Sequence, residues 1–308
     1  MNRKISIIGA GNVGASCAQY MAEANLGDVL MVDIIEGMPQ GKALDLTQAG
    51  PIRGYNGNVA GTNKYKDIKG SDLIIMTAGL ARKPGMSRED LLNMNADIVK
   101  TAAQNIKKYC PKAFVIVVSN PLDIMTYHMF KITGFPSNRI CGQAGVLDST
   151  RFRAFVAMEL GVAPTDIQAM VMGGHGDTMV PLPRYTTVGG IPIKELIPAK
   201  RIKEISERTR FGGGEIVKLL KSGSAYYAPA AASVQMARSI LLDEKKILPA
   251  SAYLTGQYGI KNIYIGVPVV LGAKGVEKII ELKLSKSEMK DLQTSATKYK
   301  GVLKEIGY

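Results

Sequence analysis

The chain of 308 residues lacks most of the features that mark an exported, membrane or metal-binding protein. Its cysteines, Cys17, Cys110 and Cys141, have neither disulfide nor metal-ligand spacing, so we expect reduced thiols, no bound metal and a cytoplasmic location. No apolar run reaches the ~18 residues that a membrane-spanning helix needs. The segment from Met1 to Lys4 leads directly into a strand pattern and does not resemble a signal peptide. We therefore expect a protein that is neither exported nor inserted in a membrane.

Compact clusters of basic residues are also missing, although the formal net charge is +13. Scattered lysines and arginines without interleaved aromatic residues do not indicate a nucleic-acid partner. They predict a solvated basic surface, whose field would attract a dianionic substrate. With 46% hydrophobic residues the chain can bury a large core, either as one large unit or as two domains.

Glycine, in contrast, is concentrated in one early turn. The stretch Gly9-Ala10-Gly11-Asn12-Val13-Gly14 follows a strand pattern at 4–8 and opens a helix pattern at 13–24. In such a G-x-G-x-x-G turn the first glycine permits a tight bend, the second lets the backbone approach a pyrophosphate, and the third allows close helix packing. The N–H groups at the start of the helix would bind the anion. This context predicts a dinucleotide site.

An acidic residue completes that pattern. The next strand pattern, at 29–32, ends in Asp33, where a carboxylate accepts hydrogen bonds from the adenosine ribose hydroxyls. Asp33 would repel a 2′-phosphate, and the following Ile34 and Ile35 supply no cation to hold one. The predicted cofactor is therefore NAD rather than NADP. A glycine-rich turn next to an ordinary strand-ending aspartate remains the weaker interpretation.

Strands and helices continue to alternate as far as residue 145. Further buried strand patterns occur at 71–79, 114–118 and 140–142. This alternation predicts an α/β fold with a doubly wound parallel sheet of Rossmann type, with ligands at the carboxyl ends of the strands. The rest of the chain reads as α+β, with a helical run at 199–221 that we expect to be interrupted near its three glycines. We predict two domains: a Rossmann domain for NAD binding at 1–145 and an α+β substrate-binding and catalytic domain at 146–308.

Histidine is scarce, and one of the two in the chain lies among glycines. His175 follows a buried strand pattern at 169–172 in the stretch Gly174-His175-Gly176-Asp177. Imidazole changes charge near neutral pH, which suits it to general acid and base catalysis. From this stretch alone, a structural histidine in a glycine-rich turn is as good an interpretation. His128, in a helical context, is assigned no role.

Two charged segments lie between these motifs. The loop 80–90 carries Arg82 and Arg88 and ends in a predicted N-cap, Ser87, with a long helix to about Tyr109. It would serve as a lid or simply as a solvated basic loop. Farther along, Asp148 and Arg151 would share one face of a helix. Taken alone, they predict a helix cap by Asp148 or Ser149 and an intrahelical ion pair.

Together these motifs resemble the lactate/malate dehydrogenase family, and most closely the malate dehydrogenases of lactate-dehydrogenase-like type. The resemblance runs nearly end to end. The segments that carry it are Gly9–Gly14, Asp33, 81–88, 118–121, 145–151 and 174–177.

The resemblance implies an NAD-dependent malate dehydrogenase that oxidises (S)-malate reversibly to oxaloacetate. By position, His175 resembles the catalytic proton acceptor and donor, Asp148 its carboxylate partner, and Arg88 the residue that polarises the carbonyl. Arg151 resembles the residue that holds the C1 carboxylate, and Asn120 the one that contacts the substrate oxygen. The implied cofactor contacts are Gly9, Ala10, Gly11, Asn12, Val13, Gly14, Asp33, Asn95, Val118, Ser119 and Asn120.

The resemblance places substrate choice at Arg82, a position that is an arginine in malate dehydrogenases and usually an uncharged amide in lactate dehydrogenases. A buried second carboxylate needs a cation, and an unpaired buried arginine should disfavour pyruvate. Ala225 resembles in position a residue that is threonine in lactate dehydrogenases, and its smaller side chain would leave room for the larger substrate. The alternatives are a lactate or dual-specificity 2-hydroxyacid dehydrogenase and, from another class, a non-catalytic dinucleotide- or nucleic-acid-binding protein.

The family also implies a homo-oligomer, either a dimer or a tetramer. The apolar helix patterns at 15–24 and 228–242 offer interfaces for it. The expected partners are then malate or oxaloacetate and further copies of the chain, with no nucleic acid and no membrane.

Overall fold

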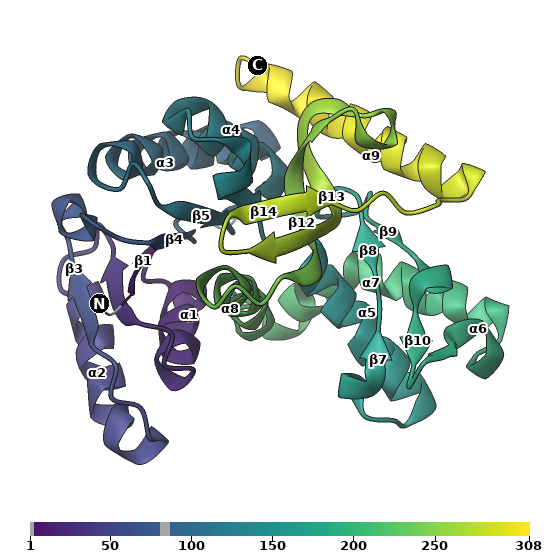
Figure 1. Cartoon of the computed structure of the whole chain (residues 1–308), viewed down its shortest axis with the longest axis horizontal. Helices are drawn as coiled ribbons and strands as arrows, with labels where there is room; N and C mark the ends of the chain where they lie inside the picture. The colour runs from purple at the N-terminus through teal and green to yellow at the C-terminus, as the bar shows by residue number, and fades with distance from the viewer. Residues whose placement is uncertain (1–2, 81–86) are drawn as a thin grey trace.

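The computed structural model describes residues 3–80 and 87–308. In this part of the chain one long sheet crosses the molecule, with strands in the order β14-β13-β12-β6-β5-β4-β1-β2-β3 (Figure 1). The strands in chain order are β1 (Lys4–Ile8), β2 (Asp28–Val32), β3 (Val59–Thr62), β4 (Leu73–Met76), β5 (Phe114–Val117), β6 (Ile140–Gly142), β12 (Lys246–Thr255), β13 (Lys261–Gly272) and β14 (Gly275–Ile279).

The strands from β1 to β6 all pair in parallel. The central strand β4 is buried along its whole length, as expected for a parallel strand that is covered on both faces. The helices that connect these strands are α1 (Asn12–Glu23), α2 (Met38–Arg53), α3 (Arg88–Tyr109) and α4 (Leu122–Thr133). The predicted Rossmann sheet is thereby confirmed.

The second half begins with α5 (Gly145–Leu160) and mixes helices with short antiparallel pairs. Its small strands are β7 (Ile167–Gln168), β8 (Val171–Met172), β9 (Val180–Pro181), β10 (Thr187–Val188) and β11 (Ile191–Pro192), and its further helices are α6 (Ile193–Leu196), α7 (Ala199–Leu220), α8 (Tyr227–Leu241) and α9 (Lys286–Glu305). Antiparallel pairing of β12, β13 and β14 extends the main sheet beyond β6. The sheet therefore runs across residue 145, where we predicted a domain boundary.

Packing corrects two local predictions. Helix α7 is continuous, so the expected break at its glycines is wrong. A Cβ on Gly212 or Gly213 would lie 3.3 Å from the Arg151 side chain, so glycine lets α7 approach α5. Such packing outweighs the ~1 kcal/mol by which glycine disfavours a helix. The predicted cap of α5 is also wrong, because Asp148 lies inside the helix and the Ser149 hydroxyl instead accepts a hydrogen bond from the Val171 N–H, 2.9 Å away.

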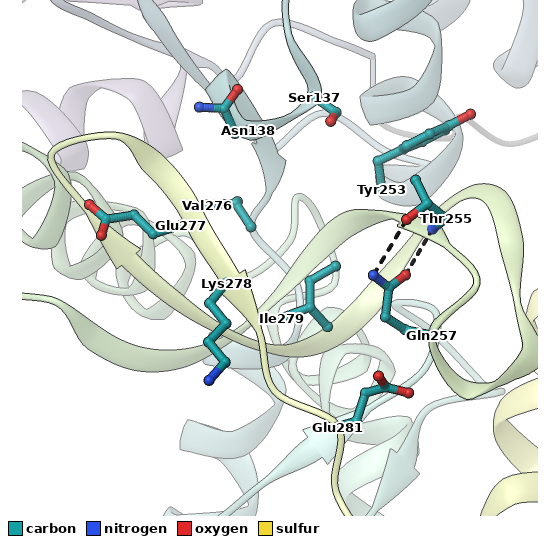
Figure 2. A pocket seen from close by; sticks show the side chains of 10 residues that line it. All are labelled: Ser137, Asn138, Tyr253, Thr255, Gln257, Val276, Glu277, Lys278, Ile279 and Glu281. Carbon is teal, nitrogen blue, oxygen red and sulfur yellow. Dashed lines mark hydrogen bonds between the residues drawn. The ribbon is translucent and has the colours of Figure 1, made fainter.

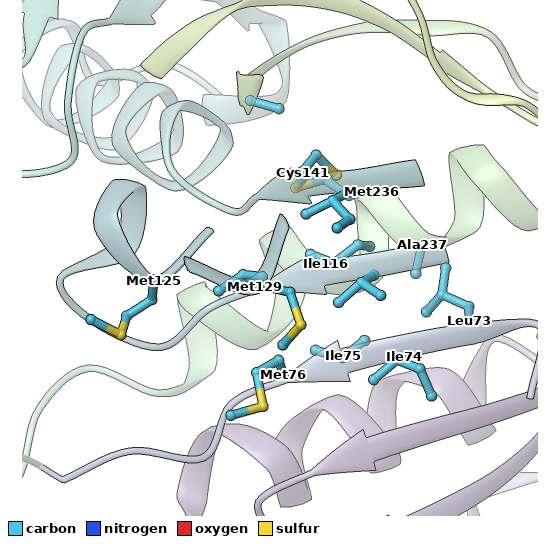
Figure 3. Packing of buried hydrophobic residues seen from close by; sticks show 14 of the residues in the cluster. Leu73, Ile74, Ile75, Met76, Ile116, Met125, Met129, Cys141, Met236 and Ala237 are labelled. Atoms are coloured by element: carbon cyan, nitrogen blue, oxygen red, sulfur yellow. The ribbon is translucent and has the colours of Figure 1, made fainter. Parts of the chain in front are cut away.

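The main hydrophobic core lies on the parallel strands and is shared by both halves of the chain. Figure 3 shows Ile75 of β4 and Ile116 of β5 packed near Met129 of α4 and Met236 of α8. Each such side chain contributes about 1.5–3 kcal/mol when it is fully buried. Because α8 follows the predicted boundary, residues after 145 help to stabilise the Rossmann sheet. No helix in the described ranges is long and apolar enough to cross a membrane.

Candidate active site

His175 lies in the turn between β8 and β9, and three glycines shape that turn. Gly173 and Gly176 have φ angles of +84° and +150°, which favour glycine. A Cβ on Gly174 would come within 1.9 Å of the Tyr299 ring. Gly173 also exchanges two backbone hydrogen bonds, of 2.9 and 3.1 Å, with Gly266 of β13. The turn that carries His175 is therefore fixed to the main sheet.

The imidazole is paired with a buried carboxylate. His175 Nδ1 lies 3.0 Å from Asp148 Oδ2, and the Asp148 side chain is only 2% exposed. Donation from Nδ1–H to this oxygen leaves Nε2 free to exchange a proton with a ligand. Burial lowers the pKa of His175, but the charge and hydrogen bond of Asp148 outweigh it, so the pKa is raised from its usual value. The site favours a protonated imidazole.

Arg151 extends the pair into a three-residue cluster. Its Nη1 lies 3.2 Å from the other Asp148 oxygen, which confirms the predicted ion pair. Among the described residues, no group forms a hydrogen bond with its buried Nε. Burial lowers the pKa of Arg151, yet a guanidinium remains charged under all ordinary conditions. An unpaired, buried guanidinium N–H suits a bidentate pair with a ligand carboxylate.

The predicted cofactor turn has the backbone geometry that a pyrophosphate requires. Gly9 has a φ of +101°, and a Cβ on Gly14 would lie 1.9 Å from the Gly9 carbonyl oxygen. By contrast, a Cβ on Gly11 would meet nothing within 4 Å. Gly9 and Gly14 therefore serve the turn and the helix, whereas Gly11 keeps its outer face open. Asn12 is exposed and Val13 half-buried beside it, whereas Ala10 is buried, so the open face that fits a dinucleotide lies at residues 11–13.

Asp33 sits beside this turn at the end of β2. Its Oδ2 accepts the Ala10 N–H at 2.7 Å, and its Oδ1 accepts the Ile35 N–H at 3.0 Å. Lys42, which the sequence reading missed, donates to the Ala10 carbonyl at 2.7 Å. The carboxylate is thus held in place with lone pairs left over, and its predicted role toward ribose hydroxyls stays a prediction.

The remaining predicted cofactor contacts, Asn95, Val118, Ser119 and Asn120, lie together at the ends of β4 and β5. Asn95 accepts the Leu80 N–H at 2.7 Å and donates to the Asn120 carbonyl at 2.9 Å, so it ties the start of the loop to Asn120. Ser119 donates to the Ala78 carbonyl at 2.5 Å, and Val118 is half-buried beside it. Asn95 and Ser119 thus contact the backbone of this chain, and their roles toward a cofactor stay predictions.

Two predicted arginines cannot be placed. Arg82 lies outside the described residues, and the structure describes no side chain for Arg88, the first residue of α3. The predicted N-cap before it is confirmed, because Ser87 and Asp90 form reciprocal hydrogen bonds of 2.9 and 3.1 Å. Ala225 is half-buried just before α8. The lid function of loop 80–90 stays a prediction.

The sequence reading missed three residues that hold the His175 turn. They are Asp123 at the start of α4 and Ser295 and Tyr299 of α9. Asp123 carries a recognisable signal, since it is the single acidic residue of the α4 sequence and lies among apolar residues at the start of that helix. The two residues of α9 carry none, because only the fold brings them to His175.

Elsewhere the structure holds features unrelated to this cluster. A surface hollow of about 380 Å³ is lined by residues such as Tyr253, Gln257 and Glu281, and no predicted site residue lines it (Figure 2). His128 is buried, with hydrogen bonds to Tyr308 and the Ala96 carbonyl, and serves packing. Within residues 3–80 and 87–308, no three His, Cys, Asp or Glu side chains form a group that could hold a metal.

Models of two protein domains match the chain almost completely. The lactate/malate dehydrogenase NAD binding domain matches residues 3–142, and the lactate/malate dehydrogenase alpha/beta C-terminal domain matches residues 145–307. The chain belongs to the lactate/malate dehydrogenase family.

Individual members of this family are similar over nearly their whole length. The malate dehydrogenase of Roseiflexus sp. is 58% identical, with 96% of each chain covered. The structure of Cryptosporidium parvum malate dehydrogenase has a TM-score of 0.97 at 48% identity and covers 99% of both chains. The lactate dehydrogenase of the same organism, complexed with lactic acid and NAD, has a TM-score of 0.96 at 46% identity and covers 100% of this chain and 99% of its own.

Proposed function

We propose that the protein is an NAD-dependent malate dehydrogenase, which oxidises (S)-malate reversibly to oxaloacetate. The observation that carries this proposal is the buried cluster of His175, Asp148 and Arg151, which joins a proton-exchanging imidazole to an unpaired guanidinium N–H. The similarity to proteins named malate dehydrogenase supports the choice of substrate.

In the oxidative direction the neutral His175 accepts the proton of the malate hydroxyl at Nε2. Asp148 stabilises the imidazolium that forms, because its carboxylate is only 3.0 Å from Nδ1. Arg151 holds the C1 carboxylate, while Arg88 and Asn120 act at the C2 oxygen, where negative charge is stabilised. Bound NAD supplies the hydride acceptor, and NADH supplies the donor in reverse. In the reductive direction His175 starts protonated, which its raised pKa favours.

The cofactor is NAD, held by the turn at Gly9–Gly14 and by Asp33. The open face of Gly11 accommodates the pyrophosphate, and Asp33 accepts the ribose hydroxyls and repels a 2′-phosphate. Val118, Ser119 and Asn120 lie at the nicotinamide half, and Asn95 is a further cofactor contact. We assign NAD binding to residues 1–145, and substrate binding and catalysis to residues 146–308.

Arg82 selects the diacid by pairing with the C4 carboxylate once the loop 80–90 has closed. An assay of NADH oxidation with oxaloacetate and pyruvate side by side tests this proposal. The wild type should prefer oxaloacetate. Arg82→Gln should lower kcat/KM for oxaloacetate by about 100-fold or more and improve pyruvate reduction, because a buried carboxylate loses its cation. Arg82→Lys, which keeps the charge, is the matched control.

Other results of the same assay would contradict the proposal in distinct ways. A preference of the wild type for pyruvate would identify a lactate dehydrogenase, which the similarity to the lactate dehydrogenase of Cryptosporidium parvum makes the second candidate. No turnover of either substrate would indicate a non-catalytic dinucleotide-binding protein.

The protein works as a homo-oligomer, a dimer or a homotetramer, in the cytoplasm. Its position there is the malate–oxaloacetate step of the tricarboxylic acid cycle. The free, buried thiols of Cys17, Cys110 and Cys141 suit a reducing compartment. The helix patterns at 15–24 and 228–242, which we expected to offer interfaces, form α1 and α8 and pack against each other within the chain. Exposed apolar side chains on α2 and α7 support self-association instead. Neither a nucleic acid nor a membrane is a partner.

A further inference from the structure

Three side chains from two distant helices hold the backbone on either side of the catalytic imidazole. The Gly174 N–H donates to Ser295 Oγ at 2.9 Å, and the His175 carbonyl accepts the Tyr299 hydroxyl at 2.9 Å. The His175 N–H donates to Asp123 Oδ2 at 2.8 Å. Ser295 and Tyr299 are neutral, so Asp123 alone among the three can bring a charge.

That carboxylate is deeply buried. Asp123 is 1% exposed, and its second oxygen accepts the Ser251 hydroxyl of β12 at 2.6 Å. A buried carboxylate is costly even when it is hydrogen-bonded. An asparagine could form both hydrogen bonds at a lower cost of burial. Hydrogen bonding to the turn therefore does not account for a carboxylate at this position.

The charged and titratable groups around His175 suggest a role for the Asp123 carboxylate. Asp148 and Arg151 face the ring from α5, Asp123 and Tyr299 interact with its backbone, and Asp177 of the same turn pairs with Lys298 at 2.7 Å. Burial raises the pKa of Asp123 to about 6, although the hydrogen bonds from Ser251 and from the His175 N–H lower it. Above that pH its negative charge raises the pKa of His175, in addition to the larger effect of Asp148.

We propose that Asp123 is a positioning residue that acts on His175 in two ways. It fixes the turn through the His175 N–H, and its charge favours the imidazolium that carbonyl reduction needs. The inference rests on the proposed function only for the identity of the substrate. It adds a second carboxylate, from the predicted NAD-binding half, to the His175–Asp148 pair.

The test is Asp123→Asn, which keeps the shape and the hydrogen-bonding capacity but removes the charge. With histidine labelled at Cε1, NMR titration of the intact protein follows only two rings, and His128→Gln identifies which signal is His175. We expect the pKa of His175 to fall by about 0.5–1 pH unit, a smaller change than a charge in direct contact would cause. The high-pH limb of the kcat/KM profile for oxaloacetate should shift to lower pH by the same amount.

Tyr299→Phe is the matched control, because it removes a neutral hydrogen bond from the same turn. It should reduce kcat while leaving the pKa of His175 where it is. Ser251→Ala is the second variant, used also if Asp123→Asn does not fold. It withdraws a hydrogen bond that favours ionised Asp123, so it should lower the pKa of His175 in the same direction, by less.

A pKa of His175 that stays at the wild-type value in Asp123→Asn, or in Ser251→Ala if that is the only folded variant, would overturn the inference and leave Asp123 a structural residue. Because the titration needs no substrate, it also separates the two proposals. A wild type that does not reduce oxaloacetate would contradict the proposed function, whereas the NMR result would still decide the role of Asp123.

Discussion

At the scale of single residues, opposing effects set the charge on His175. Burial disfavours the imidazolium, whereas Asp148, 3.0 Å away and almost fully buried, favours it more strongly. The positive charge of Arg151 lowers the pKa of His175, and the ion pair of Arg151 with Asp148 partly offsets that charge. The outcome is a pKa above the usual 6.5. His175 therefore keeps the acid form that reduction needs up to a higher pH than an ordinary histidine does.

This raised pKa predicts opposite pH dependences for the two directions. Reduction of oxaloacetate needs the imidazolium, so kcat/KM should be level at low pH and fall as pH rises through the raised pKa. Oxidation of malate needs the neutral ring, so kcat/KM should rise through the same value. Asp148→Asn should move both limbs to lower pH by about 1–3 units. Rate profiles from pH 5 to 10 measure the limbs, and profiles that do not respond to Asp148→Asn would contradict the assigned partnership.

At the scale of elements, the unit of β1, the glycine turn, α1 and β2 could be predicted from the sequence because its determinants are local. Gly9 and Gly14 lie in the turn and pack closely against each other, and Asp33 accepts a hydrogen bond from the Ala10 N–H of the same turn. The capping box of α3 was predictable for the same reason. Features that depend on long-range packing were not. The continuity of α7 depends on its fit against Arg151, far away in the sequence.

The same distinction applies to the candidate site. Asp148 and His175 stood out in the sequence by residue type and resemblance, yet nothing local joins them. Their 3.0 Å contact arises because α5 packs beside β8. Tyr299 reaches the turn from α9, near the other end of the chain, and no spacing rule connects the two. The hydrogen bonds of Asp123, Ser295 and Tyr299 to the His175 turn could therefore be identified only in the folded molecule.

Replacing two glycines of the cofactor turn by alanine should affect different properties, stability for Gly14 and cofactor affinity for Gly11. In Gly14→Ala the Cβ would lie 1.9 Å from the Gly9 carbonyl oxygen, so α1 must move from β1. We expect a loss of about 1–3 kcal/mol in the free energy of unfolding, as for other overpacked sites. In Gly11→Ala the Cβ enters open space at an ordinary φ of −65°, so stability should be kept.

The readout that separates the two is NADH affinity. Gly11→Ala should weaken NADH binding, measured by fluorescence titration, while its thermal midpoint stays close to that of the wild type. The added methyl group occupies the face that the pyrophosphate must approach. Unchanged affinity in Gly11→Ala would show that no cofactor approaches the backbone there.

At the scale of the whole molecule, one sheet connects the two predicted domains. Strand β12 pairs with β6 at Ser251, the residue that also donates to Asp123. Helix α8 packs against β4 and β5, as well as against α1. His175 is therefore held to both halves of the chain, through Asp148 on one side and Asp123 on the other. The predicted division at residue 145 follows the roles that we propose for the two halves, whereas their packing is continuous across it.

Helices α2 and α7 both leave large apolar side chains exposed. Leu44 and Ile52 of α2 are 60% and 90% exposed, and Phe211 and Leu219 of α7 are 57% and 74% exposed. Full burial of such a side chain contributes about 1.5–3 kcal/mol, so self-association would stabilise the protein substantially. Since closed symmetry repeats each contact, a dimer gains every contribution twice.

Size-exclusion chromatography with light scattering tests this association directly. The wild type should elute as a dimer or tetramer, and Leu44→Glu combined with Ile52→Glu should shift it to a smaller assembly with a lower thermal midpoint. Glutamate places an unpaired charge in the interface, which costs more than the lost apolar contact alone. Lys300→Glu, at an exposed position on α9, is the charge-changing control and should keep the wild-type mass. A monomeric wild type would contradict the proposed oligomer, and an unchanged mass in the double variant would remove α2 from the interface.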